Sequence, residues 1–284
     1  MKLPAFDYAC PTTLPEAVQL LASHDDAKVL AGGQSLVPML AFRLAQPALL
    51  VDLRKLSDLR GIRISVKGVT LGAMVRWRDI EDDKRLEAAH PLLKAAIAHV
   101  AHYQIRNRGT VGGSIAHADP AAEMPGIAMT CDAEVAVVGK SGAHVIQAAD
   151  FFQGALTTAL TSDEIIVEIH LPAWPKGRRW GFQEFARRRG DFAMAAAAVF
   201  YDQDASGRAI NAHVGVIGVA DRPRRLASVE AVLNGQVIDE ATIAKAEAAT
   251  HTAVDPQDDI HASAAYRRAL VGTMVERALK HAAM

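Results

Sequence analysis

Apolar and polar positions repeat with two different periods along the first half of the chain. Thr13 is a hydroxyl cap followed by Glu16 and an apolar run, which predicts the first helix. Alternation interrupted at Lys67-Gly68 predicts a hairpin over residues 62–73. Further predicted strands cover residues 28–31, 49–53, 134–138, 143–147 and 164–171. Predicted helices cover residues 36–44 and 90–103, and a short helix ends near Met129.

Prolines and a Lys-Gly pair interrupt the pattern at residues 172–177, which predicts a domain boundary. We therefore expect an N-terminal domain over residues 1–175 and a C-terminal domain over residues 176–284. The predicted strands of the second domain are 181–189, 193–201 and 208–218, and its predicted helices are 227–233, 240–252 and 263–281. Three strands followed by helices indicate an α+β fold, with the helices on one face of the sheet.

Composition and charge exclude several classes of protein. The 284 residues carry 31 Lys+Arg against 32 Asp+Glu, so no cationic surplus favours nucleic acid or an acidic membrane. Cys10 and Cys131 are the two cysteines, too few for an iron–sulfur cluster, a four-thiolate zinc site or a disulfide framework. Free thiols, no apolar run long enough for a membrane span and no secretory h-region lead us to expect a cytoplasmic protein.

A first glycine-rich segment, Gly32-Gly33-Gln34-Ser35, lies between a predicted strand and a predicted helix. Without Cβ atoms, the main chain can bring its N–H groups close to a bulky anion, and the start of a helix favours negative charge. Gln34 or Ser35 can cap the helix or donate to a phosphate oxygen. A purely structural turn is the alternative interpretation.

The segment Thr110-Val-Gly-Gly-Ser114 has the same chemistry within a turn-rich stretch that extends to Pro120. Two such segments suit a diphosphate, which needs donors from more than one side. A pair of tight turns would have the same glycine content, so this alternative stays open. Neither segment has the Rossmann fingerprint or the P-loop pattern, which argues against both of those folds.

Taken together, residues 31–36 (Ala-Gly-Gly-Gln-Ser-Leu) and 110–120 (Thr-Val-Gly-Gly-Ser-Ile-Ala-His-Ala-Asp-Pro) resemble the two FAD-contacting segments of a known family. The family is the flavoprotein (medium) subunit of molybdenum hydroxylases, which includes carbon monoxide dehydrogenase medium subunits and the FAD domain of xanthine dehydrogenase. The resemblance extends over the whole chain. It implies a FAD-binding domain of the vanillyl-alcohol oxidase type with two subdomains, followed by a three-stranded antiparallel sheet plus helices.

The resemblance also implies which residues contact FAD. Residues 28–36 would wrap the diphosphate, and residues 110–114 would lie against the diphosphate and the ribityl chain. His117 would lie near the flavin, Glu123 would face the ribose, and Gln183 belongs to a strand beside the isoalloxazine. The full set of candidate cofactor-binding residues is Lys28, Val29, Leu30, Ala31, Gly32, Gly33, Gln34, Ser35, Leu36, Val100, Ala101, Gly109, Thr110, Val111, Gly112, Gly113, Ser114, His117, Glu123, Ile165, Ile166 and Gln183.

The function implied by the resemblance is electron transfer. Electrons would pass from a molybdopterin centre on a large subunit, through [2Fe-2S] clusters on a small subunit, to FAD on this chain and then to an external acceptor. Two cysteines cannot hold the clusters, so the clusters require a separate subunit. A cytoplasmic dimer of heterotrimers is implied, whereas the substrate and the acceptor are not. The flavin does the chemistry, so no catalytic residue and no metal ligand is expected in this chain.

Two other functions fit part of the pattern. A free-standing flavin oxidase or dehydrogenase of a small organic substrate would need a base beside the flavin, and no such residue stands out. The chain could also be a non-catalytic docking subunit, in which the two glycine segments would be structural turns that bind no cofactor.

Histidines and arginines also form small groups in the sequence. His99, His102 and His117 could hold zinc, although a solvated helix face explains the first two more simply. Arg187-Arg188-Arg189 would alternate faces on a strand, either as an exposed edge or as a docking surface.

Overall fold

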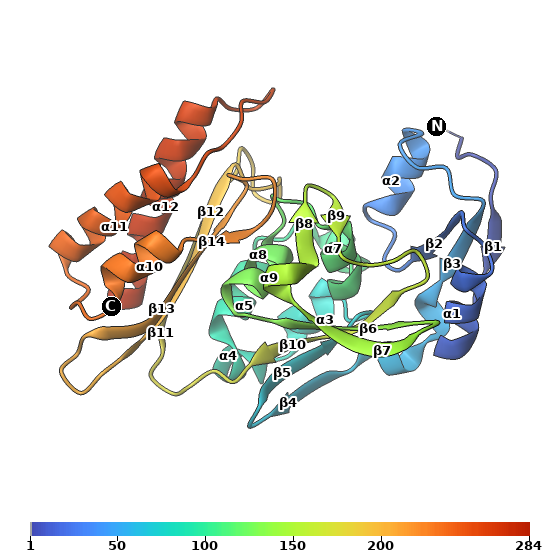
Figure 1. Cartoon of the computed structure of the whole chain (residues 1–284), viewed down its shortest axis with the longest axis horizontal. Helices are drawn as coiled ribbons and strands as arrows, with labels where there is room; N and C mark the ends of the chain where they lie inside the picture. Colours follow the sequence, from blue (N-terminus) through green and yellow to red (C-terminus); the bar gives the residue numbers. More distant parts are fainter. Residues whose placement is uncertain (1) are drawn as a thin grey trace.

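The N-terminal elements of the computed structural model, which describes residues 2–284, form a small parallel sheet at one end of the molecule (Figure 1). Its strands are β1 (Asp7–Ala9), β3 (Leu49–Asp52) and β2 (Ala27–Leu30), in that spatial order. Helix α1 (Leu14–Ala22) packs on this sheet, and α2 (Leu36–Ala41) follows β2. The Thr13 hydroxyl accepts a hydrogen bond from the Glu16 amide at 3.4 Å, as expected for the predicted cap.

A five-stranded antiparallel sheet forms the middle of the molecule. Its order is β4 (Ile62–Ser65), β5 (Gly68–Gly72), β10 (Ile165–Pro172), β6 (Glu134–Gly139) and β7 (Gly142–Gln147). Helices cover it: α3 (Trp77–Asp82), α4 (Leu86–Ala89), α5 (Pro91–Ile97), α6 (Tyr103–Arg106), α7 (Val111–His117), α8 (Glu123–Thr130) and α9 (Ala148–Phe151). A short hairpin of β8 (Phe152–Gly154) and β9 (Thr157–Thr158) follows α9. The hairpin predicted over residues 62–73 is confirmed.

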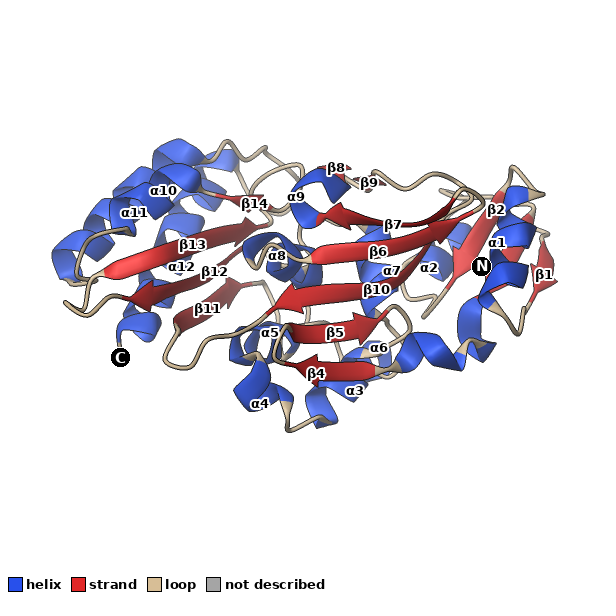
Figure 2. Ribbon diagram, turned by 60° about the horizontal axis from the view of Figure 1, so that its bottom comes forward, coloured by secondary structure: helices blue, strands red, loops and turns tan. Residues whose placement is uncertain are grey.

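The C-terminal sheet is antiparallel, in the order β11 (Arg179–Phe185), β12 (Ala195–Gln203), β13 (Ala209–Ile217) and β14 (Arg224–Arg225). Helices α10 (Ala227–Leu233), α11 (Glu240–Ala253) and α12 (Ala264–Ala283) lie on one face, as Figure 2 shows. The α+β fold class is confirmed, and the two-residue strand β14 adds to the three strands expected. No helix among residues 2–284 is both long enough and apolar enough to cross a membrane.

Strand β12 is buried on both faces, and this joins the two halves of the molecule. Ala195, Ala197 and Val199 face the core beneath α10–α12. Ala196, Ala198 and Phe200 face the core of the middle part, where α8 packs on the sheet. Small alanine side chains let helices approach from both sides, so the C-terminal sheet is held firmly against the middle of the molecule.

The single helix predicted over residues 90–103 is wrong. The chain forms α5, an irregular stretch over residues 98–102 and then α6. Ala101 has φ +43°, a left-handed conformation that an α-helix cannot contain. The Arg106 guanidinium stabilises this break by donating to the carbonyl oxygens of Val100 and Ala101 at 3.0 and 2.8 Å.

Two further expectations about local structure are wrong. The stretch predicted to be turn-rich begins with helix α7, which is capped by Thr110. The strand predicted over residues 181–189 ends at Phe185, so Arg187, Arg188 and Arg189 lie in an exposed loop and not along a strand. Gly190, which has φ +88°, lies in the same loop.

Candidate functional site

The two glycine-rich segments are far apart in the sequence, and the fold brings them into contact. A Cβ atom added to Gly32 would overlap the carbonyl oxygen of Arg108 and lie 2.9 Å from the Cα of Gly109. A Cβ atom on Gly113 would lie 3.7 Å from the Cβ of Ala31. Glycine at position 32 is therefore required for the close approach of one segment to the other.

The first segment presents unpaired amide groups. Within residues 2–284, the amide N–H groups of Gly32, Gly33, Gln34 and Ser35 donate to no protein acceptor. Gly33 has φ +72°, and the Gln34 side chain folds back to donate to the Gly32 carbonyl at 3.2 Å. Residues 31–36 are half-buried, so this segment stays within reach of a ligand. Consecutive free amides in a sharply bent backbone form a concave anion-binding site.

The second segment contributes differently, because most of its amides are already used. The amides of Val111 and Gly112 donate to the carbonyl oxygens of Val75 and Ala73 at 2.9 and 2.8 Å. The Gly113 amide donates to the Thr110 hydroxyl at 3.2 Å, and the Ser114 amide donates to the Thr110 carbonyl. What this segment can offer a ligand is hydroxyl groups and a close, side-chain-poor surface. Sequence reasoning had assigned amide donors to both segments.

The break between α5 and α6 holds two further candidate residues. Val100 and Ala101 lie there, and the Gly190 backbone packs against Ala101 and His102 so closely that a Cβ on Gly190 would lie 2.7 Å from the Ala101 carbonyl oxygen. Gln183 is half-buried on β11, opposite Ala197 of β12. Because paired residues share one face of a sheet, Gln183 lies with Ala197 on the face beneath α10–α12. The structure therefore does not bring Gln183 together with Val100 and Ala101.

Other candidates have different environments. Ile165 and Ile166 are both buried, and they pack into different hydrophobic cores on the two faces of β10. Lys28 is exposed on β2, with Val29 and Leu30 half-buried beside it, and His117 is half-buried at the end of α7. Leu36 begins α2.

Glu123 is 4% exposed at the first position of α8. Burial, and to a lesser extent the neighbouring Glu184 and Asp119 carboxylates, raise the pKa of this carboxyl to about 8. Its own backbone N–H opposes the shift by hydrogen bonding. The side chain is therefore largely protonated at neutral pH.

Sequence reasoning missed the partners of Glu123. The Glu184 side chain is 3% exposed on β11, and its Oε1 atom lies 3.6 Å from the Nδ1 atom of His99. Its Oε2 atom is buried and has no hydrogen-bond partner among the described residues. His99 follows α5 and packs against the Phe182 ring, with 5.1 Å between centroids. The expectation that His99 lies on a solvated helix face is therefore wrong.

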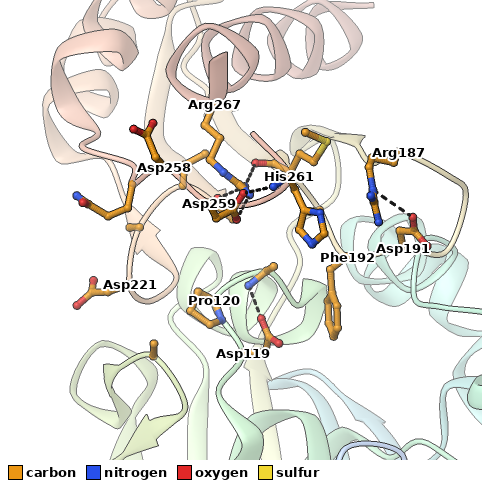
Figure 3. Close-up of a pocket in the computed structure, with 18 of the residues that line it drawn as sticks. Asp119, Pro120, Arg187, Asp191, Phe192, Asp221, Asp258, Asp259, His261 and Arg267 are labelled. Carbon is orange, nitrogen blue, oxygen red and sulfur yellow. Dashed lines mark hydrogen bonds and ion pairs between the residues drawn. The ribbon is translucent and has the colours of Figure 1, made fainter. Parts of the chain in front are cut away.

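A cavity of about 620 Å³ opens between the middle part and the C-terminal part (Figure 3). Asp119 and Pro120, just after α7, form one side, and the loop with Arg187, Asp191 and Phe192 forms another. The third side is the turn before α12, where Asp259 accepts from the buried guanidinium of Arg267. None of the candidate residues from the sequence lines this cavity.

Metal binding finds no support in the described part of the chain. Among residues 2–284 no three or more His, Cys, Asp or Glu side chains are grouped so that they could hold a metal ion. His99 pairs with Glu184 instead, and His102 lies beside Gly190.

The two glycine segments, which the fold brings together, have the chemistry of an anion-binding site. Residues 4–174 match the family described as FAD binding domain in molybdopterin dehydrogenase. Residues 180–282 match the CO dehydrogenase flavoprotein C-terminal domain. The chain therefore belongs to the FAD-binding medium (flavoprotein) subunits of molybdenum hydroxylases, which confirms the resemblance inferred from residues 31–36 and 110–120.

Individual relatives match over nearly their whole length. The nicotine 6-hydroxylase medium subunit of Paenarthrobacter nicotinovorans is 38% identical, covering 99% of each chain. The structure of quinoline 2-oxidoreductase from Pseudomonas putida 86 superposes with a TM-score of 0.95 and 39% identity, covering 100% of this chain and 98% of that one. Carbon monoxide dehydrogenase from Hydrogenophaga pseudoflava superposes with a TM-score of 0.96 and 36% identity, covering 99% and 98%. These comparisons support a medium subunit over a free-standing flavin oxidase.

Proposed function

We propose that this chain holds FAD by its diphosphate, with the amides of residues 32–35 as the principal donors and the hydroxyls of Thr110 and Ser114 opposite them. The single observation that carries this proposal is the contact between the two segments, which leaves four adjacent amides unpaired beside a second polar surface. A phosphate group accepts such hydrogen bonds without a cationic side chain. The residues present therefore fit FAD.

The remaining candidates extend the proposed site away from the diphosphate. Val100 and Ala101 would border the flavin end, with Gly109, Val111, Gly112, Gly113 and His117 around the ribityl chain. Ile165 and Ile166 would act from within the core by shaping β10, since both are buried. Bound FAD would supply the redox chemistry, since a flavin can take up and release electrons singly or in pairs. This chain's own residues bind the cofactor, orient it and limit its contact with water.

The family and the relatives support a place for this chain in a larger complex. We propose that it receives electrons from [2Fe-2S] clusters on a small subunit, which are reduced by a molybdopterin centre on a large subunit, and passes them to an external acceptor. An arrangement as a dimer of heterotrimers follows from the same family membership. The structure of carbon monoxide dehydrogenase from Hydrogenophaga pseudoflava lacks the Mo-pyranopterin moiety of the molybdenum cofactor, and a cofactor of this kind in that enzyme agrees with the proposed division of labour.

We also propose the division into a FAD-binding domain, residues 1–175, and a C-terminal domain, residues 176–284. The two family matches, which cover residues 4–174 and 180–282, support this division. A cytoplasmic location is proposed as well, because the thiols of Cys10 and Cys131 are both free.

The experiment that tests the proposed function is purification of the native complex followed by cofactor and subunit analysis. The expected result is one FAD per copy of this chain, with a molybdopterin subunit and an iron–sulfur subunit in equal amounts. A chain that purifies without flavin, and takes up none when FAD is added, would contradict the proposal. Bleaching of the flavin by organic substrates in the isolated chain would instead indicate a free-standing oxidase.

A further inference from the structure

Three titratable side chains meet where the α5–α6 break, α8 and β11 come together: His99, Glu184 and Glu123. We propose that they carry a proton between solvent and the FAD crevice when the flavin is reduced. This inference rests on the proposed function, since it requires FAD in the crevice bordered by Val100 and Ala101.

His99 forms the solvent end. Its side chain is 42% exposed, and its Nδ1 atom lies 3.6 Å from Glu184 Oε1. An imidazole exchanges protons with water near neutral pH, so an exposed histidine that contacts a buried carboxyl can pass protons inward. The Phe182 ring fixes the orientation of the imidazole by packing against it.

Glu184 forms the buried middle. One carboxyl oxygen contacts His99, while the other, Oε2, is buried without any hydrogen-bond partner among residues 2–284. An unpartnered buried oxygen is costly, and such groups call for a functional explanation. A carboxyl with one oxygen towards a solvent-accessible imidazole and one free oxygen can relay a proton once a water molecule or a small side-chain shift closes the 3.6 Å separation.

Glu123 forms the inner end, at the start of α8. It is buried and carries a proton at neutral pH, because burial and the adjacent Glu184 and Asp119 carboxylates oppose its ionisation. The titratable groups that face it are therefore Glu184 on β11 and Asp119 after α7, with His99 behind Glu184. A neutral buried carboxyl close to other carboxyls can donate its proton and then be reprotonated.

The overall step balances in charge. Bound FAD would need a proton when it is reduced by two electrons, and the path would supply that proton. Glu123 releases its proton towards the crevice. The Glu184 carboxylate then takes a proton from His99 and passes it to Glu123, and His99 is reprotonated from water. Each of the three side chains ends in its starting state, and reoxidation returns the proton along the same route.

The chain contains a matched control pair. His144 Nε2 lies 3.6 Å from Glu164 Oε1, with the histidine similarly exposed at 46%. The second oxygen of Glu164 accepts from the Thr161 amide at 2.8 Å, so this pair has no free oxygen to continue a path. Glu164→Gln therefore removes a His–Glu contact of the same length elsewhere in the molecule.

The experiment follows proton uptake and flavin bleaching together. FAD-loaded protein in weak buffer with a pH indicator is mixed in a stopped-flow instrument with reduced methyl viologen, which delivers electrons without protons. In the native chain and in Glu164→Gln, one proton per flavin should be taken up in step with bleaching. In Glu184→Gln, bleaching should persist while proton uptake lags at least tenfold behind it. Equal rates in Glu184→Gln and the native chain would overturn the proposal.

A second measurement needs neither FAD nor turnover. Infrared spectroscopy of the FAD-free chain should show the band of a protonated carboxyl at pH 7, absent in Glu123→Gln and displaced in Glu184→Gln. If Glu184→Gln does not fold, His99→Gln replaces it in the stopped-flow experiment with the same expected lag. A chain that retains no FAD contradicts the proposed function, whereas a FAD-loaded His99→Gln with undelayed proton uptake contradicts only the proton path.

Discussion

Gly32 shows how one residue without a side chain determines whether the candidate site can form. Any Cβ at this position would overlap the Arg108 carbonyl oxygen, so the two segments would have to separate. Gly33, in contrast, needs glycine for its backbone, with φ +72°. Both glycines are visible in the sequence, but only the fold shows that glycine is needed for close packing at position 32 and for backbone conformation at position 33.

Gly32→Ala should therefore weaken FAD binding at least tenfold and lower the free energy of unfolding by about 1–3 kcal/mol, as overpacking does. Gly61→Ala is the matched control, since a Cβ there meets nothing within 4 Å and Gly61 has an ordinary backbone conformation, φ −78°. Fluorescence titration with FAD and urea denaturation measure the two effects. If Gly32→Ala binds FAD as well as Gly61→Ala does, the contact between the segments is not needed for binding.

Glu123 is a single residue whose shifted pKa predicts how the free energy of unfolding depends on pH. Its pKa is about 8 in the folded chain against 4.5 for the ordinary group, so the folded state holds an extra proton between these values. Stability from this group is therefore present at low pH and is lost as the pH rises towards 8, at up to about 1.4 kcal/mol per pH unit.

Glu123→Gln should remove this loss. Relative to the native chain, the variant should become steadily more stable between pH 5 and pH 8, in urea denaturations of the FAD-free protein at each pH. A constant stability difference across that range would show that Glu123 titrates normally in the folded chain.

At the scale of single elements, α7 links the fold to the site. Thr110 caps it through the Gly113 amide, while the amides of Val111 and Gly112 are held by the strand end and turn at Val75 and Ala73. The helix is thus fixed at its first turn, with Ser114 on the next. This anchoring positions the second glycine segment opposite residues 32–35.

Thr110→Ala should cost about 1 kcal/mol of stability, which is typical of losing a cap, and should also reduce FAD affinity. Thr13→Ala removes the corresponding cap of α1, far along the chain from the glycine segments, and should cost stability alone. Thr110→Ser should restore both properties. Unaltered FAD affinity in Thr110→Ala, measured by fluorescence titration, would exclude a role for this hydroxyl in the site.

The elements that were predicted correctly have local signals, and those missed do not. Thr13, the Lys67-Gly68 turn and the alternation in β6 and β10 depend on neighbours in sequence, so the pattern reveals them. The break at Ala101 depends on Arg106 and on Gly190 from another part of the chain. Helix α7 was hidden because adjacent glycines normally disfavour a helix, and tertiary contacts at Ala73 overcome that preference.

The candidate site was predictable to a similar degree. Both glycine segments could be found from the sequence, because paired glycines next to hydroxyl residues are visible there, but only the fold shows that the two segments meet. Glu184 could not be found, since a glutamate on an ordinary strand carries no sign of its burial. Only the approach of α8 and His99 from distant segments makes it unusual.

At the scale of the whole molecule, stacked side chains join the middle sheet to the C-terminal sheet. They lie in and around the linker, residues 173–178, which connects β10 to β11. The Trp174 ring packs against His90, with 4.6 Å between centroids, and against Phe200 at 5.4 Å. The Arg178 guanidinium lies over both Trp174 and Phe200 and pairs with Asp202 at 2.8 Å. Trp174 and Arg178 thus fix the position of the C-terminal sheet relative to the middle sheet. Any crevice between the two sheets depends on that position.

Trp174→Ala should lower stability by roughly 2 kcal/mol and speed tryptic cleavage after Lys176, which is exposed in the linker. Trp180→Ala is the control, since Trp180 packs against His281 of α12 instead of the linker. Limited proteolysis followed by mass spectrometry locates the cuts. Equal cleavage of the linker in the two variants would mean that Trp174 does not hold the halves together.

The most direct measurement of the central claim is a crystal structure of the chain loaded with FAD. The diphosphate oxygens are predicted to lie within hydrogen-bonding distance of the amide nitrogens of residues 32–35, with Thr110 or Ser114 hydroxyls on the opposite side. FAD bound with its diphosphate elsewhere, or these four amides left without a phosphate acceptor, would contradict the account.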